Sequence, residues 1–308
     1  MQIYTITLNP AYDIHANAPS FQEGCENLAE ITSRQAGGKG INISRALCTN
    51  GIANKAVVVL GRSNADEFKQ DMDRAGMDVC FLERPGRIRE NLTLHCADKP
   101  ETRISFAGFS LDDQILQDVL DVLSVDAQTI VTFSGRIASG MSVEKVKQFL
   151  LELKKRGAKL VLDSKSLTVQ DIMEIKPWLI KPNQEELSAY VGHCVETLEE
   201  AARQAKLNFG GQADHVMISM GEQGAVLLTG GKTYMAAPPK VRALSTVGAG
   251  DSTIAGFLAA FSMGQTPQVC LKRAVACGTA ACLTEGTLPP AKADVQTIYL
   301  QTKVYDCN

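Results

Sequence analysis

The chain has 308 residues, of which 31 are Lys or Arg and 34 are Asp or Glu, so its formal net charge is −3. Apolar residues make up 45% and charged residues 21%, as in an ordinary soluble globular protein, and no basic block is present to drive nucleic-acid binding. No apolar run approaches the roughly 20 residues that span a bilayer, and the N-terminal MQIYTITLNP lacks the basic start of a signal peptide. We therefore expect a cytoplasmic protein with neither a membrane nor a nucleic-acid partner.

Cysteine and histidine usage agrees with this expectation. The nine cysteines form no CxxC pair, and none of the four histidines lies at zinc-finger spacing from a cysteine pair. Scattered cysteines are typical of small buried side chains in a reducing compartment. We expect neither a disulfide framework nor a structural zinc.

From about residue 55 onward, short β-rich runs alternate with amphipathic stretches of helical length. The runs predict strands at 56–61, 129–133, 159–163, 178–181 and 215–220. The stretches predict helices over 64–76, 143–157, 250–263 and 268–284. Because the strands are continuously apolar, both of their faces should be covered, which favours a parallel sheet built from βαβ units.

Two segments interrupt this alternation, residues 12–35 and 87–108. Within the second, the runs 91–97 and 102–107 predict a hairpin whose strands are joined by the turn-rich DKPE. Strands inserted into a βαβ series usually form a separate small sheet. We interpret these segments as a lid or a subunit contact.

The common nucleotide-binding motifs are absent. A P-loop at 231–233 fails because Val226 stands where its first glycine is needed. Two candidates for the GxGxxG fingerprint fail because Thr253 and Ile43 replace the third glycine. HExxH and GxSxG do not occur, and a dehydrogenase is disfavoured.

The segment STVGAGDS, residues 245–252, immediately precedes a long apolar helical stretch. Gly248, Ala249 and Gly250 leave backbone N–H groups unobstructed at a helix N-terminus, where the helix dipole attracts an anion. Asp251 follows in the first turn, where a phosphoryl-transfer enzyme would place its base. The alternative is that Asp251 caps the helix and the glycines form a tight turn. Spacing alone does not decide between them.

A second glycine cluster, QAGGKGIN, occupies residues 35–42 and also enters a helical stretch. Its glycines allow the backbone to approach a ligand, Lys39 offers a positive charge, and Asn42 can both donate and accept hydrogen bonds. The alternative is an ordinary loop with a solvated lysine.

A third motif, KPNQEEL, lies at 181–187, after a predicted strand. Asn183 and Glu186 are three residues apart on one helix face, a spacing that could hold a hydrated Mg²⁺ through water. The alternative is a capping box in which Asn183 begins the helix and the acidic residues occupy its first turn.

Five motifs, in this order along the chain, together resemble the PfkB, or ribokinase-like, family of carbohydrate kinases: TLNPAYD (7–13), AGGKGIN (36–42), KPNQEE (181–186), SMGEQGA (219–225) and STVGAGDS (245–252). The resemblance covers essentially the whole chain. It implies a three-layer α/β/α fold with a mostly parallel central sheet and a small β-sheet lid. It also implies one domain over 1–308, with lid strands from about 12–35 and 87–108.

The resemblance also implies roles for individual residues. Asp251 matches the catalytic base, and Gly248, Ala249 and Gly250 match the anion hole that faces the transferred phosphoryl group. Asn183 and Glu186 match the motif that positions Mg²⁺ and its waters. The residues expected to contact ATP are Lys181, Asn183, Ser219, Gly221, Gly224 and Thr246. The residues expected to contact the sugar and its phosphate are Asp13, Gly38, Lys39, Asn42, Arg89, Asn91 and Arg103.

The opening TLNPAYD resembles the branch whose substrates already carry one phosphate. The implied reaction is ATP- and Mg²⁺-dependent phosphorylation of a hexose monophosphate, with fructose 1-phosphate favoured and tagatose 6-phosphate as the alternative. Lys39 and Arg89 are the candidates for binding the existing phosphate, unless Arg89 is a solvated charge paired with Glu90. A non-catalytic sensor on the same fold is a further alternative. A homodimer formed through the lid is expected.

The sequence departs from the family pattern in three places. The loop expected as SGSLPxG reads SGRIASG at 134–140, and Ser164-Lys165-Ser166 stands where relatives have small residues. Glu90 follows Arg89, which places an acid beside the predicted phosphate-binding cation. These changes affect the choice of sugar more than the kinase assignment.

Overall fold

The computed structural model describes residues 1–97, 99–284 and 286–307. In this part of the chain, ten strands form a central sheet. Their order is β14 (Lys303–Cys307), β13 (Lys232–Ala237), β12 (Ala225–Thr229), β11 (His215–Ser219), β10 (Leu179–Ile180), β9 (Lys159–Asp163), β8 (Ile130–Ser134), β1 (Ile3–Thr7), β4 (Lys55–Gly61) and β5 (Val79–Arg84). The sheet is parallel from β11 to β5, and β12, β13 and β14 continue it in antiparallel fashion.

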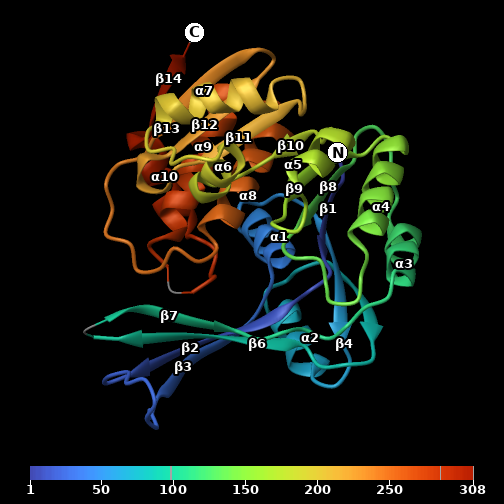
Figure 1. Ribbon diagram of the computed structural model, residues 1–308, viewed down its shortest axis with the longest axis vertical. Coiled ribbons are helices and arrows are strands. Elements are labelled where there is room, and N and C mark those ends of the chain that lie inside the picture. Colours follow the sequence, from blue (N-terminus) through green and yellow to red (C-terminus); the bar gives the residue numbers. More distant parts are fainter. Residues whose placement is uncertain (98, 285, 308) are drawn as a thin grey trace.

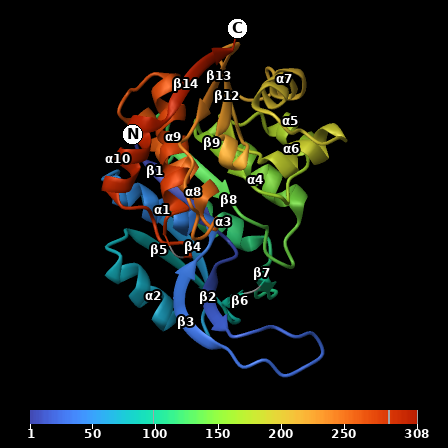
Figure 2. The same cartoon turned by 90° about the vertical axis from the view of Figure 1, so that its left-hand side faces the viewer.

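Helices cover both faces of this sheet (Figure 2). One face carries α1 (Lys39–Thr49), α2 (Ala65–Arg74), α8 (Ala249–Ser262) and α9 (Pro267–Ala281), with α10 (Lys292–Gln301) packed on α9. The other carries α3 (Gln114–Val122), α4 (Val143–Lys155), α5 (Val169–Ile175), α6 (Gln184–Val191) and α7 (Leu198–Phe209). Successive residues of β4 alternate between the two cores, since Val57 joins one cluster and Val58 another. This two-sided burial explains the continuously apolar strands.

The predicted strands and helices are confirmed, with ends that shift by at most three residues. The α/β class and the mostly parallel sheet are confirmed as well. The antiparallel edge from β12 to β14 was not predicted, because β13 and β14 mix polar with apolar residues and lack the continuous apolar run of the buried parallel strands. Among the described residues, none of the helices combines the length and apolarity needed to cross a membrane.

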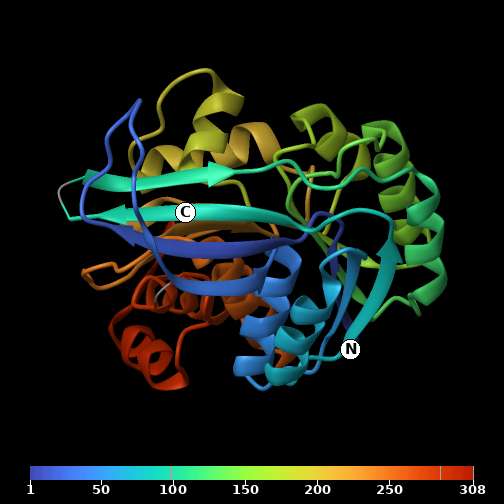
Figure 3. The ribbon, with the colours of Figure 1, turned by 90° about the horizontal axis from the view of Figure 1, so that it is seen from below.

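A second sheet of four strands has the order β3 (Glu30–Gly37), β2 (Ala11–Ala18), β6 (Arg89–Cys96) and β7 (Lys99–Ser105). It runs beneath the main body as a separate layer (Figures 1 and 3). The predicted hairpin is β6–β7, and Asp98 of its predicted turn lies outside the described residues. The separate small sheet predicted from the two interrupting segments is therefore confirmed.

The strand order places a ligand site. The chain passes from β1 to its neighbour β4 on one side and later returns to β8 on the other side. In open α/β sheets, such a reversal leaves a crevice at the carboxyl ends of the strands, where ligands bind. The small sheet lies at this end of the main body, below α1 and α8 in Figure 1.

Candidate active site

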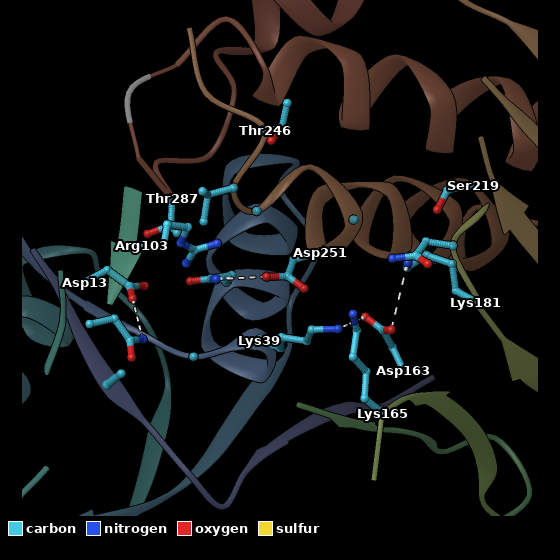
Figure 4. Close-up of a pocket in the computed structure, with 18 of the residues that line it drawn as sticks. Asp13, Lys39, Arg103, Asp163, Lys165, Lys181, Ser219, Thr246, Asp251 and Thr287 are labelled. Carbon is cyan, nitrogen blue, oxygen red and sulfur yellow. Dashed lines mark hydrogen bonds and ion pairs between the residues drawn. The ribbon is translucent and has the colours of Figure 1, made fainter. Parts of the chain in front are cut away.

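A pocket of about 430 Å³ lies between the main body and the small sheet. Every predicted site residue lines it except Ala249, Gly221 and Gly224. Gly221 instead begins the short 3₁₀ turn that follows β11, and Gly224 is its C-cap. Segments far apart in the sequence meet here, from the start of β2 to the N-terminus of α8, as Figure 4 shows.

Asp251 lies in the first turn of α8, and its residue is only 6% exposed. Gly248 is the N-cap of this helix and has φ 79°, a left-handed conformation that glycine adopts without strain. The carboxylate Oδ2 accepts a hydrogen bond from Nδ2 of Asn42 on α1, at 2.8 Å. The capping interpretation of Asp251 is therefore wrong, because Gly248 begins the helix and the carboxylate bonds to a different helix.

Burial and the neighbouring charges together set the pKa of the Asp251 carboxyl. Burial is the largest cause that raises its pKa to about 6, and the nearby Asp163 carboxylate adds to the rise. Lys39, the Asn42 hydrogen bond and Lys181 act in the opposite direction. A carboxyl with a pKa near 6 is ionised at neutral pH and still accepts a proton more readily than an exposed aspartate.

Lys39 does not project as a solvated cation. Its Nζ donates a hydrogen bond to Oδ2 of Asp163 at 2.9 Å, and Lys181 Nζ lies 3.9 Å from the other oxygen of this carboxylate. Burial opposes the charge on Lys39, but Asp163 and Asp251 outweigh it and raise the pKa of the lysine. Burial likewise disfavours ionised Asp163, yet Lys181 and Lys39 hold its pKa below the usual range.

The small sheet supplies one end of the pocket. Asn91 donates from Nδ2 to Oδ1 of Asp13 at 2.9 Å and accepts from Nη1 of Arg89 at 3.2 Å. Burial lowers the pKa of Arg89, Arg136 and Arg103 lower it further, and its Nε is buried with no partner among the described residues. The Asp13 carboxylate opposes this fall in pKa. Two arginines, Arg89 and Arg103, thus line this end.

Glu90 does not pair with Arg89, contrary to one alternative. Its carboxylate lies 3.1 Å from Arg34 and 3.4 Å from Arg87. Neighbouring residues of a strand point to opposite faces, so Glu90 and Arg89 project away from each other. Glu90 therefore does not neutralise the positive charge of Arg89.

The main body supplies the other end of the pocket. Asn183 and Glu186 form a reciprocal capping box, with bonds of 2.8 and 3.0 Å between side chain and backbone. The capping box predicted as the alternative is therefore present in the structure. Glu186 keeps its Oε1 toward Lys165, at 3.7 Å. Among the described residues, no cluster of three His, Cys, Asp or Glu could hold a metal ion.

Figure 4 shows the two ends on opposite sides of Asp251. Asp13, Arg103 and Thr287 lie on one side, and Asp163, Lys165, Lys181 and Ser219 lie on the other. Lys39 extends toward the second group. The arrangement suits two anionic ligands that approach the carboxylate from opposite directions.

Sequence reasoning missed Asp163, Lys165 and Thr287 as site residues. Asp163 carried a usable signal, because a charged residue ending an apolar strand marks the carboxyl edge of a parallel sheet. Lys165 follows it by two residues. Thr287 carried no signal, since it reaches the pocket through a loop after α9 and packs against Gly248.

Comparison with known proteins places the chain among sugar kinases. The model of the pfkB family of carbohydrate kinases matches residues 5–294. A protein named 1-phosphofructokinase from Bacillus subtilis is 32% identical over 92% of this chain and 93% of its own length. The crystal structure of phosphofructokinase-2 from Escherichia coli with substrates and products superposes with a TM-score of 0.90, at 27% identity over 97% of this chain and 99% of that one. Its tetrameric inhibited form gives 0.86, at 27% identity over 97% and 98%.

Asp251→Asn should stabilise the fold at pH 8 more than at pH 5. An acid whose folded pKa is raised favours folding at low pH, and this contribution is lost as the pH rises through the folded value. The rise from 3.8 to about 6 corresponds to about 3 kcal/mol of unfolding free energy between the fully protonated and the fully ionised carboxyl, of which about 1.4 kcal/mol is lost between pH 5 and pH 8. Urea unfolding of both proteins at both pH values measures it, with Asp306→Asn on exposed β14 as control. Equal gains at both pH values would contradict the buried-carboxylate account.

Proposed function

The chain belongs to the pfkB family of carbohydrate kinases and is an ATP-dependent sugar kinase; from this premise we propose that it transfers the γ-phosphoryl group of ATP to the 6-hydroxyl of fructose 1-phosphate. The observation that carries the proposal is the position of Asp251 between an arginine-lined end and a lysine-lined end of one pocket. The name of the Bacillus subtilis relative supports this choice of sugar.

In the proposed reaction, Asp251 accepts the proton of the sugar hydroxyl as the oxygen attacks the γ-phosphorus, and ADP leaves. The backbone N–H groups of Gly248, Ala249 and Gly250 face the transferred group at the N-terminus of α8, where negative charge is stabilised. Asn42 orients the carboxylate from α1. Because Asp251 is buried, its charge is poorly solvated and the proton transfer is favoured.

The phosphate already on the sugar is proposed to bind at the small sheet. Arg89 is anchored by Asn91, yet its Nε has no partner in the part of the chain that the structure describes, and Arg103 lines the same end. Lys39 was predicted to share this role, but its ammonium pairs with Asp163 on the other side of Asp251. We therefore assign Lys39 to the transferred phosphoryl group, and Arg89 and Arg103 to the phosphate of the substrate.

Mg²⁺ is proposed to bind together with the phosphates of ATP. The side chains present fit a cation held mainly by the phosphates and by water. Glu186 offers one carboxylate oxygen to it, and the side chain of Asn183 is used to cap α6. Mg²⁺ commonly keeps several waters and is held by one or two carboxylates plus substrate phosphates. When bound, the ion neutralises charge on the phosphates, and Glu186 would orient its waters.

Asp251→Asn should lower kcat by about two to four orders of magnitude, because a general base is removed. Its affinity for a non-hydrolysable ATP analogue should stay within a few-fold of wild type. Retention of more than about a tenth of kcat would refute the base assignment.

A wild-type protein that makes no ADP in response to any sugar phosphate would be a sensor. Turnover of fructose 1-phosphate and tagatose 6-phosphate, measured side by side, distinguishes the two sugars.

Arg89→Ala should raise KM for fructose 1-phosphate by about ten- to a hundredfold, since each charge-assisted contact is worth roughly 1.5–3 kcal/mol. The effect should largely vanish with fructose as acceptor. Arg87→Ala is the matched control, two residues away and paired with Glu90. Lys39→Ala should instead lower kcat on both sugars. Equal losses of Arg89→Ala on both sugars would mean that the arginine shapes the pocket without binding the phosphate.

A second copy of the chain is proposed to pack on the outer face of the small sheet. Asp13, Asn91 and Arg103 lie on the face toward the pocket, and alternation places apolar residues on the other. That outer face carries the half-buried Leu92, with Ile31 62% and Ile104 40% exposed near its edges, whereas Leu94 is already buried against Ala16 and Phe21 of the same chain. An exposed apolar face of this kind is typical of an interaction surface.

Ile104→Asp should therefore convert a dimer into a monomer, as measured by sedimentation velocity. Leu300→Asp is the control, because Leu300 is 71% exposed on α10, away from the small sheet. A wild-type monomer, or an Ile104→Asp variant that still dimerises, would contradict the proposed interface.

A further inference from the structure

Lys165 lies at the lysine-lined end of the pocket, two residues beyond the end of β9. Its side chain is 51% exposed, and its Nζ lies 3.7 Å from Oε1 of Glu186, whose side chain is 16% exposed. A separation of 3.7 Å is longer than a hydrogen bond. The ion pair is therefore loose, and the donors of the ammonium group remain available.

The backbone that carries Lys165 is fixed on both sides. Ser164 Oγ accepts a hydrogen bond from the backbone N–H of Ser166 at 3.3 Å. Ser166 Oγ in turn accepts one from the backbone N–H of Ile137 at 3.1 Å, which joins this loop to the segment 134–140. Because the loop is held in place, the long side chain can move while its Cα stays at the rim of the pocket.

The other two lysines at this end of the pocket already pair with a buried carboxylate. Lys39 and Lys181 both face the buried Asp163 carboxylate, at 2.9 and 3.9 Å. Both lysines must stay beside Asp163, because the loss of either would weaken the compensation of this buried charge, and Lys39 can meet the transferred phosphoryl group only from that position. Lys165 can turn away more easily, since Glu186 keeps the hydrogen bond that its Oε2 accepts from the backbone N–H of Asn183.

We propose that Lys165 binds the outer phosphates of ATP, an inference that rests on the proposed function and adds a nucleotide-binding residue to it. On binding, the ammonium group turns from Glu186 to the polyphosphate, where a charge-assisted hydrogen bond is stronger than its loose ion pair. Glu186 is then released toward the hydrated cation that accompanies the nucleotide. Lys165 and Mg²⁺ thus neutralise the same phosphates.

Isothermal titration with the non-hydrolysable analogue AMP-PNP tests this inference on the intact protein. Lys165→Ala should weaken AMP-PNP binding by about ten- to a hundredfold, while the affinity for AMP, which lacks the outer phosphates, stays within about twofold of wild type. Lys165→Arg should restore most of the affinity. Lys303→Ala, at an exposed position on β14, should change neither. Weakening of AMP and AMP-PNP binding by the same factor would overturn the inference, because it would indicate a structural role.

Magnesium dependence gives a second readout. The loss in Lys165→Ala should be largest at low free Mg²⁺ and shrink as Mg²⁺ is raised, since the ion can replace the missing charge. Unchanged AMP-PNP affinity at every Mg²⁺ concentration would overturn the inference but leave the proposed kinase reaction intact. A wild-type protein that binds AMP-PNP through Lys165 yet phosphorylates no sugar phosphate would refute the proposed reaction and leave the role of Lys165 standing.

Discussion

The site depends on one constraint, which is that a carboxylate must remain buried and ionised at the N-terminus of a helix. Asp251 meets it because Asn42 donates to one oxygen and because the charges of Lys39 and Lys181 lower its pKa, although the Asp163 carboxylate that both lysines face raises it. Burial alone would raise its pKa further. The balance leaves the pKa at about 6, so the group is a base at neutral pH and costs folding stability there.

Several features of the fold follow from this constraint. The crossover from β5 to β8 opens the crevice at the carboxyl ends of the strands, and α1 and α8 both begin there. Gly40 lets α1 approach β1, because a Cβ at this position would lie 2.6 Å from the carbonyl oxygen of Ile6. That approach brings Lys39 and Asn42 to Asp251. The small sheet then covers the crevice with its polar face and adds the arginines.

Much of this could be predicted from sequence, and the limits have physical causes. Apolar periodicity predicted β4, β8 and α4 because burial on a sheet face or a helix stripe leaves a local pattern. The glycine motifs predicted that Gly38 and Gly248 lie near a ligand, since their backbone requirements are local. The pairing of cations with anions could not be predicted, because the partners are far apart in the sequence. Lys39 is 124 residues from Asp163, and its bond to this carboxylate directs its side chain away from the arginines. Lys165 and Thr287 were missed for the same reason.

A crystal structure with fructose 1-phosphate and AMP-PNP bound together tests the account most directly. It should show the 6-hydroxyl within about 2.6–3.2 Å of the Asp251 carboxylate. The γ-phosphate should lie over Gly248 to Gly250, and the sugar phosphate should contact Arg89 and Arg103. A sugar phosphate bound instead at Lys39 or Lys165, or a 6-hydroxyl with no contact to Asp251, would contradict the two-ended arrangement on which the proposed reaction rests.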